Sequence, residues 1–471
     1  MTLTAELRDV LGHDRVLSEP LEKWVYGMDS GVMRGDVQLV AFPESTAEVA
    51  TIVRIAKHYR TPIVARGAGT GLAGGAVPTQ PGLVVVLTRM NSVEIDVENA
   101  TAWVGPGVIN LDLSKETGPF GFHFAPDPSS QSACTIGGNI ANNSGGPHCL
   151  AEGSTVGHVL AVEMVTADGE VVTLGGAAPD PIGLDLRGVV VGSEGTLGII
   201  TKALVRLTPN PPDVRTLLTA FARVEDAAAT VSGVIARGVV PAALEMMDQR
   251  MTEAVERFVS AGFPTDAAAV LLAEVVGMSA AVEAEAAIIE DVARENNATT
   301  LRVAADEAER AKLWLGRKSA FGAVAQAAPD YYLHDTVVPR TKLVETMTRV
   351  YEIADRHGIM MLNVFHAGDG NLHPLMAFDS AEEGMLERVK AAAGEIVEVC
   401  VEMGGSLSGE HGIGIEKRDL MPLIFSEADL DAQARIRESF DPDEVFNPGK
   451  VLPAGSRCFD MGRPPLEGMW V

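Results

Sequence analysis

Length, composition and charge set the first limits on what this chain can be. Its 471 residues are too many for one ordinary domain, and 46% of them are hydrophobic, so there is material for more than one core. The formal net charge of −27 argues against nucleic acid or an anionic membrane surface as a general partner, because both are bound mainly through Lys and Arg.

Cysteine usage and the N-terminal segment bear on the compartment. The four cysteines form no CxxC pair, and the start MTLTAELRDV lacks the basic and apolar regions of a signal peptide. The chain contains no run of roughly 18 apolar residues that would predict a membrane-spanning helix. These features favour a reducing, cytoplasmic compartment and leave peripheral docking on a membrane-bound partner open.

The N-terminal half combines glycine-rich stretches with short β-branched runs. Ser45 and Glu48 form a capping-box pattern, and the apolar spacing after them predicts a helix ending near Arg60. Strands are predicted at 61–66, 82–88, 92–97, 101–105, 157–166 and 170–174, the last two joined as a hairpin.

A domain boundary is predicted at Asn210-Pro211-Pro212, where the composition changes. Beyond it, alanine- and glutamate-rich helices at 279–297 and 381–403 alternate with strand-like segments at 269–276 and 359–365. The second half is therefore expected to be an α+β domain.

The first glycine-rich stretch, RGAGTGLAGG at 66–75, contains a literal GxGxxG after a predicted strand. A Rossmann unit needs a helix directly after this motif, whereas Pro78 and Pro81 follow here, so the Rossmann interpretation is rejected. Glycines also allow backbone N–H groups to surround a pyrophosphate. The alternative is a glycine-rich turn without a ligand.

Two further glycine-rich stretches favour a ligand. PDPSSQSACTIGGNIANNSGG lies at 126–146 and GSEGTLGIIT at 192–201. The three together resemble the FAD-binding domain of the vanillyl-alcohol-oxidase type. In that family the first loop wraps the pyrophosphate, the second follows the ribityl chain and flavin, and the third supports the adenine side and the flavin. Some members tether FAD through a histidine in the first loop; Thr70 stands there in this chain, so non-covalent FAD is expected.

The resemblance also implies which residues hold FAD. NPGK at 447–450 matches the segment that returns toward the flavin, although a plain turn is an equal alternative for Asn447. The expected FAD-binding residues are Arg66, Gly67, Ala68, Gly69, Thr70, Gly71, Leu72, Gly74, Gly75, Pro126, Asp127, Ser132, Thr135, Gly138, Asn139, Asn142, Asn143, Glu194, Gly195, Ile199, Ile200 and Asn447.

A histidine-containing motif, NVFHAGDGNLHP at 363–374, marks the second half. His366 and His373 are separated by glycines, and a turn between them can bring both imidazoles to one metal ion; histidines without a ligand role are the alternative. Glu410 and His411 lie between glycines further on. Two histidines and one glutamate recur as a catalytic set for divalent metals.

These motifs are similar to FAD-linked D-2-hydroxy-acid dehydrogenases of the glycolate oxidase and D-lactate dehydrogenase type. The matching segments are FHAGDGNLHPL, SGEHGIGIEKR and FDPDEVFNPGKVLP. The resemblance implies zinc or manganese bound by His366, His373 and Glu410, with His411 as the base while the α-hydride leaves to flavin N5. It also implies that Arg317 binds the substrate carboxylate, against the alternative of a helix-surface arginine.

The expected substrate is small. Family members that act on dicarboxylates are expected to have polar residues where this chain has Leu333 and Leu375. The favoured reaction is therefore oxidation of D-lactate or glycolate to the 2-oxo acid. The alternatives are another D-2-hydroxy acid such as D-2-hydroxyglutarate, a non-catalytic flavin-binding subunit of a larger complex, and a non-redox flavin enzyme such as an alkyl-ether-lipid synthase.

Partners and domains complete the expectations. The electron acceptor is expected to be an iron–sulfur subunit or an electron-transfer flavoprotein, with any cluster on the partner because the chain has no CxxC run. The oligomeric state stays open, a homodimer included. The expected α+β fold has a helical segment at 1–34, a two-lobed FAD-binding domain of the PCMH type at 35–212, an FAD-linked oxidase C-terminal domain that binds substrate and metal at 213–455, and a tail at 456–471.

Overall fold

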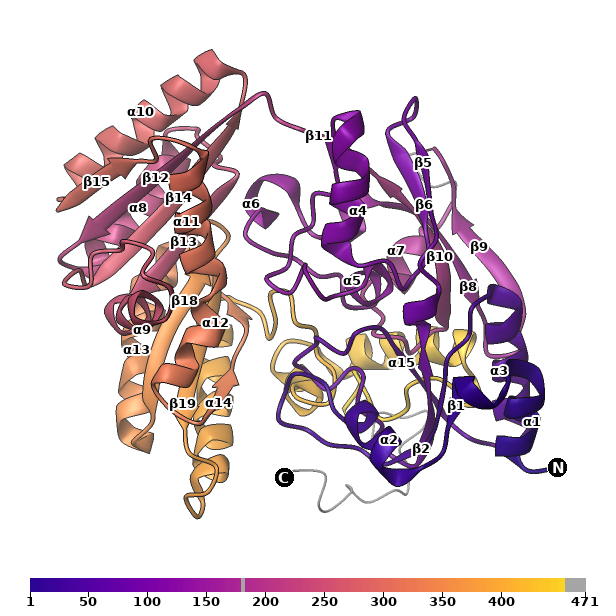
Figure 1. The fold of residues 1–471 in the computed structure, drawn as a ribbon. Helices are drawn as coiled ribbons and strands as arrows, with labels where there is room; N and C mark the ends of the chain where they lie inside the picture. Colours follow the sequence, from indigo (N-terminus) through magenta and orange to yellow (C-terminus); the bar gives the residue numbers. More distant parts are fainter. Residues whose placement is uncertain (179–182, 454–471) are drawn as a thin grey trace. The chain divides into compact units, whose positions relative to one another are not determined.

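The computed structural model describes residues 1–178 and 183–453, so the expected tail at 456–471 lies outside the described residues (Figure 1). Contacts divide the chain into two compact units. The first unit holds residues 1–145, 154–210 and the chain from Glu410 onward, and the second unit holds 146–153 and 211–409. Each unit is described by itself.

The first sheet of the first unit has the strand order β1-β2-β4-β3. Strands β2, β4 and β3 are parallel, and β1 pairs antiparallel with β2. Helices α1 and α3 bury their apolar faces against this sheet in one core. The bounds are α1 (Leu3–Leu11), β1 (Val16–Leu17), α2 (Pro20–Trp24), β2 (Val37–Ala41), α3 (Thr46–His58), β3 (Ile63–Arg66) and β4 (Gly82–Val86).

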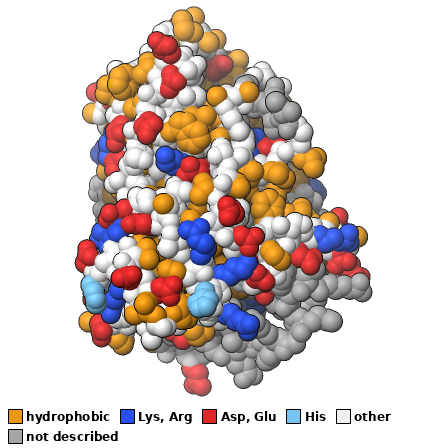
Figure 2. All heavy atoms as spheres, turned by 90° about the vertical axis from the view of Figure 1, so that its right-hand side faces the viewer, with side chains coloured by type: hydrophobic (Ala, Val, Ile, Leu, Met, Phe, Trp, Pro, Cys, Tyr) orange, Lys and Arg blue, Asp and Glu red, His pale blue; other side chains and the backbone are white. Residues whose placement is uncertain are grey.

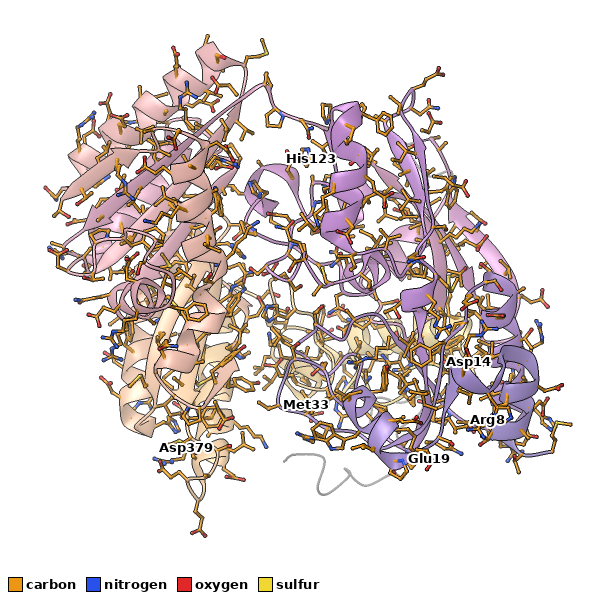
Figure 3. All side chains as sticks on the ribbon, viewed as in Figure 1. Arg8, Asp14, Glu19, Met33, His123 and Asp379 are labelled. Atoms are coloured by element: carbon orange, nitrogen blue, oxygen red, sulfur yellow. The ribbon has the colours of Figure 1, made fainter. Side chains whose placement is uncertain are left out.

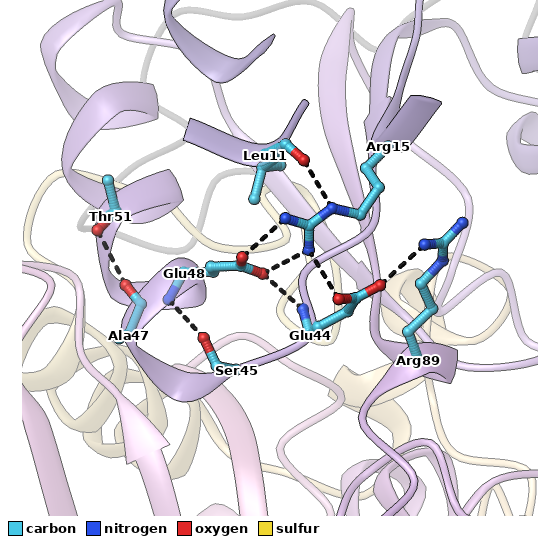
Figure 4. Close-up of polar contacts among 8 residues, drawn as sticks. All are labelled: Leu11, Arg15, Glu44, Ser45, Ala47, Glu48, Thr51 and Arg89. Atoms are coloured by element: carbon cyan, nitrogen blue, oxygen red, sulfur yellow. Dashed lines mark hydrogen bonds and ion pairs between the residues drawn. The ribbon is translucent and has the colours of Figure 1, made fainter. Parts of the chain in front are cut away.

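At the start of α3, the Glu48 carboxylate does not form the hydrogen bond that the predicted capping box requires (Figure 4). Ser45 caps the helix by accepting from the Glu48 amide at 3.3 Å, as the sequence predicts. The Glu48 carboxylate instead accepts two bonds of 2.8 Å from Arg15 and one of 2.7 Å from the Glu44 amide. The capping box is therefore half formed, because a guanidinium offers the carboxylate a charged partner.

The second sheet of the first unit is antiparallel, in the order β5-β6-β10-β8-β9. Its β8–β9 pair is the predicted hairpin, and two separate sheets account for the two lobes expected from the sequence. The bounds are β5 (Val93–Asp96), β6 (Thr101–Val104), α4 (Asn110–Thr117), β7 (Phe122–His123), α5 (Ile136–Asn142), β8 (Val159–Val165), β9 (Val171–Gly175), α7 (Leu186–Val190), β10 (Ile199–Arg206), β11 (Thr208–Pro209) and α15 (Glu427–Phe440).

The second unit is built on a sheet with the order β15-β12-β14-β13-β18-β19-β16, to which β17 adds on β19. Its pairs are antiparallel, which confirms an α+β rather than a parallel α/β arrangement. The strands are β12 (Asp213–Phe221), β13 (Ala243–Asp248), β14 (Ala269–Gly277), β15 (Thr300–Val303), β16 (Asp330–Leu333), β17 (Thr336–Val337), β18 (Met360–His366) and β19 (Asn371–Phe378). The helices are α6 (Cys149–Glu152), α8 (Val224–Ala236), α9 (Gln249–Val259), α10 (Ser279–Glu295), α11 (Glu307–Lys318), α12 (Ala320–Ala323), α13 (Leu343–His357) and α14 (Met385–Glu402).

The division into units differs from the expected domains at two places. The segment from Glu410 onward clusters with the first unit, and 146–153 clusters with the second. The physical reason for the first difference is that the chain returns to β3, where Ile63 forms a parallel bridge with Phe446 and accepts from the Asn447 amide at 2.7 Å. The chain passes from the first unit to the second between Asn210 and Pro211.

The surface view in Figure 2 shows one face of the protein. Among the residues drawn in colour, acidic and basic side chains are interspersed and no continuous basic patch is visible.

Candidate active site

The first glycine-rich loop follows β3 and reaches β4 without any helix, which confirms that the Rossmann interpretation was rightly rejected. Gly69 and Gly74 have φ of +76° and +82°, a region that favours glycine. Within the described part of the chain, the amides of residues 69–72 donate to no protein acceptor. Successive amides left in this way form a site suited to an anion such as a pyrophosphate.

The second loop touches the first. A Cβ added at Gly67 would lie 2.2 Å from Oγ1 of Thr135, so only glycine fits there. Thr135 in turn caps α5 by accepting from the Gly138 amide. A bulkier residue at position 67 would therefore separate two of the predicted cofactor loops.

The third loop closes on the second. The Glu194 amide donates to Ala141 at 2.8 Å, and Glu194 itself has φ of +54°. Cβ atoms added at Gly71 and Gly75 would lie 3.9 Å from Nδ2 of Asn142 and 3.9 Å from a Glu194 carboxylate oxygen. The three loops predicted from separate sequence segments are thus brought together.

The half-buried Asp29 and the buried Glu194 hold these loops through backbone amides. Asp29 accepts from the Gly74 amide at 2.9 Å, and Glu194 accepts from the amides of Ile413 and Gly414, both at 2.7 Å. Burial raises the pKa of both carboxyl groups, because no cation donates directly to them among the described residues. Met33, labelled in Figure 3, packs with Val77 and Ile415 and lies against Gly74 of the first loop.

The returning C-terminal segment also forms hydrogen bonds with the first loop. Asn447 donates to the carbonyls of Gly75 at 3.0 Å and Glu194 at 2.6 Å, and Lys450 donates to Gly75 at 2.6 Å. Burial lowers the pKa of Lys450 to about 7. The sequence picked out Asn447 from its motif but assigned no role to Lys450, Asp29 or their bonds.

Not every expected FAD-binding residue faces this meeting point. Asn139 bonds Asn110, Asn143 caps α5 and accepts from Val156, and Ser132 lies exposed in a turn. Ile199 and Ile200 pack into the two cores of the first unit. At this meeting point lie the first loop, whose amides at 69–72 donate to no described protein acceptor, and the neighbouring Asn142 and Glu194 side chains.

In the second unit, the histidine motif forms the β18–β19 hairpin. The register pairs Val364 with His373 and His366 with Asn371, so both imidazoles emerge on one face of the sheet. Their ring centroids are 5.0 Å apart, and both side chains are buried. The expectation that a turn brings the two rings together is confirmed.

A buried carboxylate that the sequence analysis missed stands beside this pair. Glu245 of β13 is the direct cross-strand partner of His366, and its two oxygens lie 2.8 and 2.9 Å from Nδ1 of that ring. The available signal was an acid in the middle of the mostly apolar strand ALEMMD, where an unpaired charge would be costly.

Arg317 binds the same carboxylate. Its Nε donates to Glu245 at 2.7 Å and its Nη2 ion-pairs with the same oxygen. The side chain is 1% exposed, so the alternative of a surface arginine is wrong. Burial by itself raises the pKa of Glu245, but the charge of Arg317 and the hydrogen bond from His366 outweigh it and leave that pKa below its usual value.

Asp335 approaches the second histidine. Its Oδ1 lies 3.5 Å from Nε2 of His373, and its Oδ2 accepts from the Gly409 amide at 2.9 Å and from the Ser408 hydroxyl. The chain is therefore anchored beside His373 one residue before Glu410. In the first unit, the carbonyl of the next residue, His411, accepts from Asn142 at 3.2 Å.

A second ion pair, between the buried Glu274 and the half-buried Arg310, joins α11 to the sheet. Glu274 of β14 accepts from Nε and Nη2 of Arg310 at 2.9 and 2.8 Å, from Trp314 at 2.6 Å and from Thr216. His148 stacks on Trp314 at 5.7 Å and places Nε2 3.7 Å from the carboxylate. Burial opposes ionisation, but hydrogen bonds from His148 and Arg310 hold the pKa of Glu274 at about 2.

Comparison with protein families assigns both halves. Residues 37–175 match the family described as FAD binding domain, and residues 210–451 match FAD linked oxidases, C-terminal domain. The chain belongs to the FAD-linked oxidases. The bare amides of the first loop and the convergence of the second and third loops fit that assignment, and the protein is an FAD-dependent oxidoreductase.

Curated relatives cover most of this FAD-linked oxidase. Glycolate oxidase subunit GlcD of Escherichia coli strain K12 is 44% identical over 90% of this chain and 85% of its own. The Bacillus subtilis subunit of the same name is 40% identical over 89% of each chain. D-lactate dehydrogenase of Archaeoglobus fulgidus is 35% identical over 88% of this chain and 91% of its own.

Solved structures of low sequence identity share the fold. A p-cresol methylhydroxylase superposes with a TM-score of 0.81 at 17% identity, covering 95% of this chain and 96% of its own. An alkyldihydroxyacetonephosphate synthase superposes with a TM-score of 0.74 at 19% identity, covering 95% and 84%. Among the described residues of this oxidase, no helix has the length and apolar character to cross a membrane.

Proposed function

We propose that the protein oxidises a small D-2-hydroxy acid, D-lactate or glycolate, to the 2-oxo acid. The observation that carries this proposal is the buried pair His366 and His373 beside Arg317, on one sheet face in a family of FAD-linked oxidases. The relatives named glycolate oxidase subunit and D-lactate dehydrogenase support the substrate class.

The residues have separate roles in this proposal. His366, His373 and Glu410 hold a divalent metal, zinc or manganese, and Glu410 directly follows the anchored Gly409. When bound, the metal supplies a Lewis acid and non-covalent FAD supplies the electron acceptor. Arg317 binds the substrate carboxylate, and His411 accepts the hydroxyl proton.

The imidazole pair fits a metal of this kind. A carboxylate can only accept a hydrogen bond, so Nδ1 of His366 carries the proton and Nε2 keeps the lone pair that a metal needs. His373 adds a second nitrogen ligand from the neighbouring strand. Neutral imidazoles with oxygen ligands suit zinc and manganese.

The size of the substrate is limited by two leucines. Leu333 and Leu375 are direct cross-strand partners on β16 and β19, and both are buried. His373 and Leu375 lie two residues apart on one strand, so their side chains share a face. An apolar surface next to the histidines favours a short aliphatic side chain over a second carboxylate, whose burial would be costly.

Electrons must leave the flavin for a partner. The relatives include proteins named as subunits of glycolate oxidase, which supports a complex. We propose an iron–sulfur subunit or an electron-transfer flavoprotein as the acceptor, with this chain peripheral to any membrane.

The test is anaerobic stopped-flow reduction of the bound flavin, with metal measured on the same sample. D-lactate or glycolate should bleach the flavin, and L-lactate and D-2-hydroxyglutarate should do so much more slowly. Absence of bleaching with every 2-hydroxy acid, in protein loaded with FAD and metal, would overturn the proposal. Equal rates with D-lactate and D-2-hydroxyglutarate would overturn the size assignment.

A further inference from the structure

Glu245 is the point where two proposed site residues meet. The β13–β18 register puts it directly opposite His366, so both side chains lie on the same face of the sheet. Helix α11 crosses that face, with Arg310, Trp314 and Arg317 at helical spacing on one stripe. The carboxylate is 1% exposed.

The contact with His366 determines which ring nitrogen is available. Both Glu245 oxygens lie within 2.9 Å of Nδ1, and an ionised carboxylate has no proton to donate. Nδ1 therefore donates, and Nε2 is left as the ligand atom. A carboxylate behind a ligating histidine fixes the tautomer and the ring orientation and makes the imidazole a better ligand.

The contact with Arg317 leaves part of the guanidinium open. Nε and Nη2 are directed at one Glu245 oxygen, whereas Nη1 has no hydrogen-bond partner among residues 1–178 and 183–453. Donors of a buried guanidinium are normally satisfied, so a buried Nη1 without one points to an anionic ligand.

We propose that Glu245 is the positioning residue shared by the metal site and the carboxylate site. It presents Nε2 of His366 to the metal and holds Arg317 so that the Nη1 side receives the substrate carboxylate. This inference rests on the proposed function. It adds that metal affinity and substrate affinity depend on one side chain that touches neither ligand.

Glu245→Gln is the direct test, because it keeps the size and removes the charge. The amide oxygen can still accept a hydrogen bond, but the NH2 group is itself a donor and cannot accept from the N–H groups of His366 and Arg317. We expect metal affinity, measured by competition with a chelator, to fall about 10- to 100-fold. The KM for D-lactate should rise by at least about 10-fold while FAD content stays at the level of the unmodified protein.

Glu274→Gln is the matched control. Glu274 is also a buried strand glutamate that accepts from Nε and Nη2 of an arginine on α11, but it contacts neither His366 nor Arg317. This variant should keep metal affinity and KM within about 2-fold, although it loses stability. Equal effects of the two variants on metal affinity and KM would show a merely structural role and overturn the proposal.

Two further arms keep the outcome decisive. If Glu245→Gln fails to fold, Glu245→Asp replaces it; this variant restores the charge but shortens the reach, and unaltered metal affinity and KM in it would also overturn the proposal. Chelator competition uses Zn²⁺ or Mn²⁺ alone and needs no turnover. If Glu245→Gln lowers metal affinity but the unmodified protein never reduces its flavin, the proposed function is contradicted and the metal role of Glu245 is not. If the unmodified protein binds neither Zn²⁺ nor Mn²⁺, the metal role of Glu245 is overturned.

Discussion

Two acids of the first unit and two of the second have different kinds of partner. In the first unit, Asp29 and Glu194 accept from backbone amides of glycine-rich segments, and burial raises their pKa values. In the second unit, Glu245 and Glu274 pair with arginines of α11, and their pKa values are lowered. Asp29 and Glu194 therefore hold the backbone of the cofactor loops, whereas Glu245 and Glu274 orient side chains.

The second unit repeats the comparison on a smaller scale. Arg310 and Arg317 are both held by a buried glutamate through Nε and Nη2. The carboxylate of Glu274 is surrounded by structural donors, whereas Glu245 also contacts His366 and leaves Nη1 of Arg317 open. The Glu274–Arg310 pair thus contributes to stability, whereas the similar Glu245–Arg317 pair belongs to the proposed site.

The largest expected effect comes from removing a proposed ligand of the second unit. His373→Ala should lose bound metal and reduce turnover by more than about 100-fold, since a direct ligand matters at least as much as its supporting residues. FAD content should not change. Metal analysis and turnover with a dye acceptor check this result.

His357→Ala is the control for that variant, because this histidine pairs with Glu395 on α13 and α14, away from the sheet face of His373. It should retain metal and activity. Full activity of His373→Ala would remove His373 from the ligand set.

A substitution in the first unit should weaken FAD binding and leave metal binding unchanged. Gly67→Ala places a Cβ 2.2 Å from Thr135 Oγ1, and the required shift should weaken FAD binding by about 10-fold or more. Gly157→Ala is the control, because a Cβ there meets nothing within 4 Å. FAD retained after dialysis, measured by absorbance, separates them; equal retention would contradict the tight contact of the first two loops.

A smaller effect should separate the two arginines of α11. Arg317→Lys should raise the KM for D-lactate by about 10-fold, because an ammonium cannot hold Glu245 and a carboxylate in the same fork geometry. Arg310→Lys should leave KM unchanged and lower the melting temperature. A matching rise in KM for both variants in steady-state kinetics would point to the helix as a whole and not to Arg317.

The smallest effect is on stability at acid pH. Glu274 has a pKa of about 2 in the folded protein against 4.5 ordinarily, so its contribution is present above pH 4.5 and is lost as pH falls toward 2. The loss is about 3 kcal/mol. In Glu274→Gln, the free energy of unfolding from denaturant titrations should change less over this range by about that amount.

Glu253→Gln supplies the control for the acid-stability experiment. Glu253 forms an exposed pair with Arg257, and such pairs contribute little. Its pH dependence should match that of the unmodified protein. Parallel curves for Glu274→Gln and the unmodified protein would show that the buried pair does not carry the effect.

Features that depend on residues close together in the chain could be predicted from the sequence. The glycine loops, the His366–His373 motif, the hairpin at 157–174 and the boundary near Asn210 all depend on residues close in the chain. Glu245, Asp335 and Glu274 were missed because each is an acid without a surrounding motif, in or beside a mostly apolar strand. Their partners lie 36 to 121 positions away, and no local pattern names them.

The amino-acid sequence by itself determined the element types, the three cofactor loops and the family resemblance, because turn residues and side-chain periodicity act locally. Tertiary structure decided which charges meet. Antiparallel register set Glu245 against His366, α11 brought Arg317 to both, and the returning C-terminal segment placed Asn447 and Lys450 on the first loop. These pairings are needed because the groups are buried, and a buried charge or polar group without a partner costs free energy.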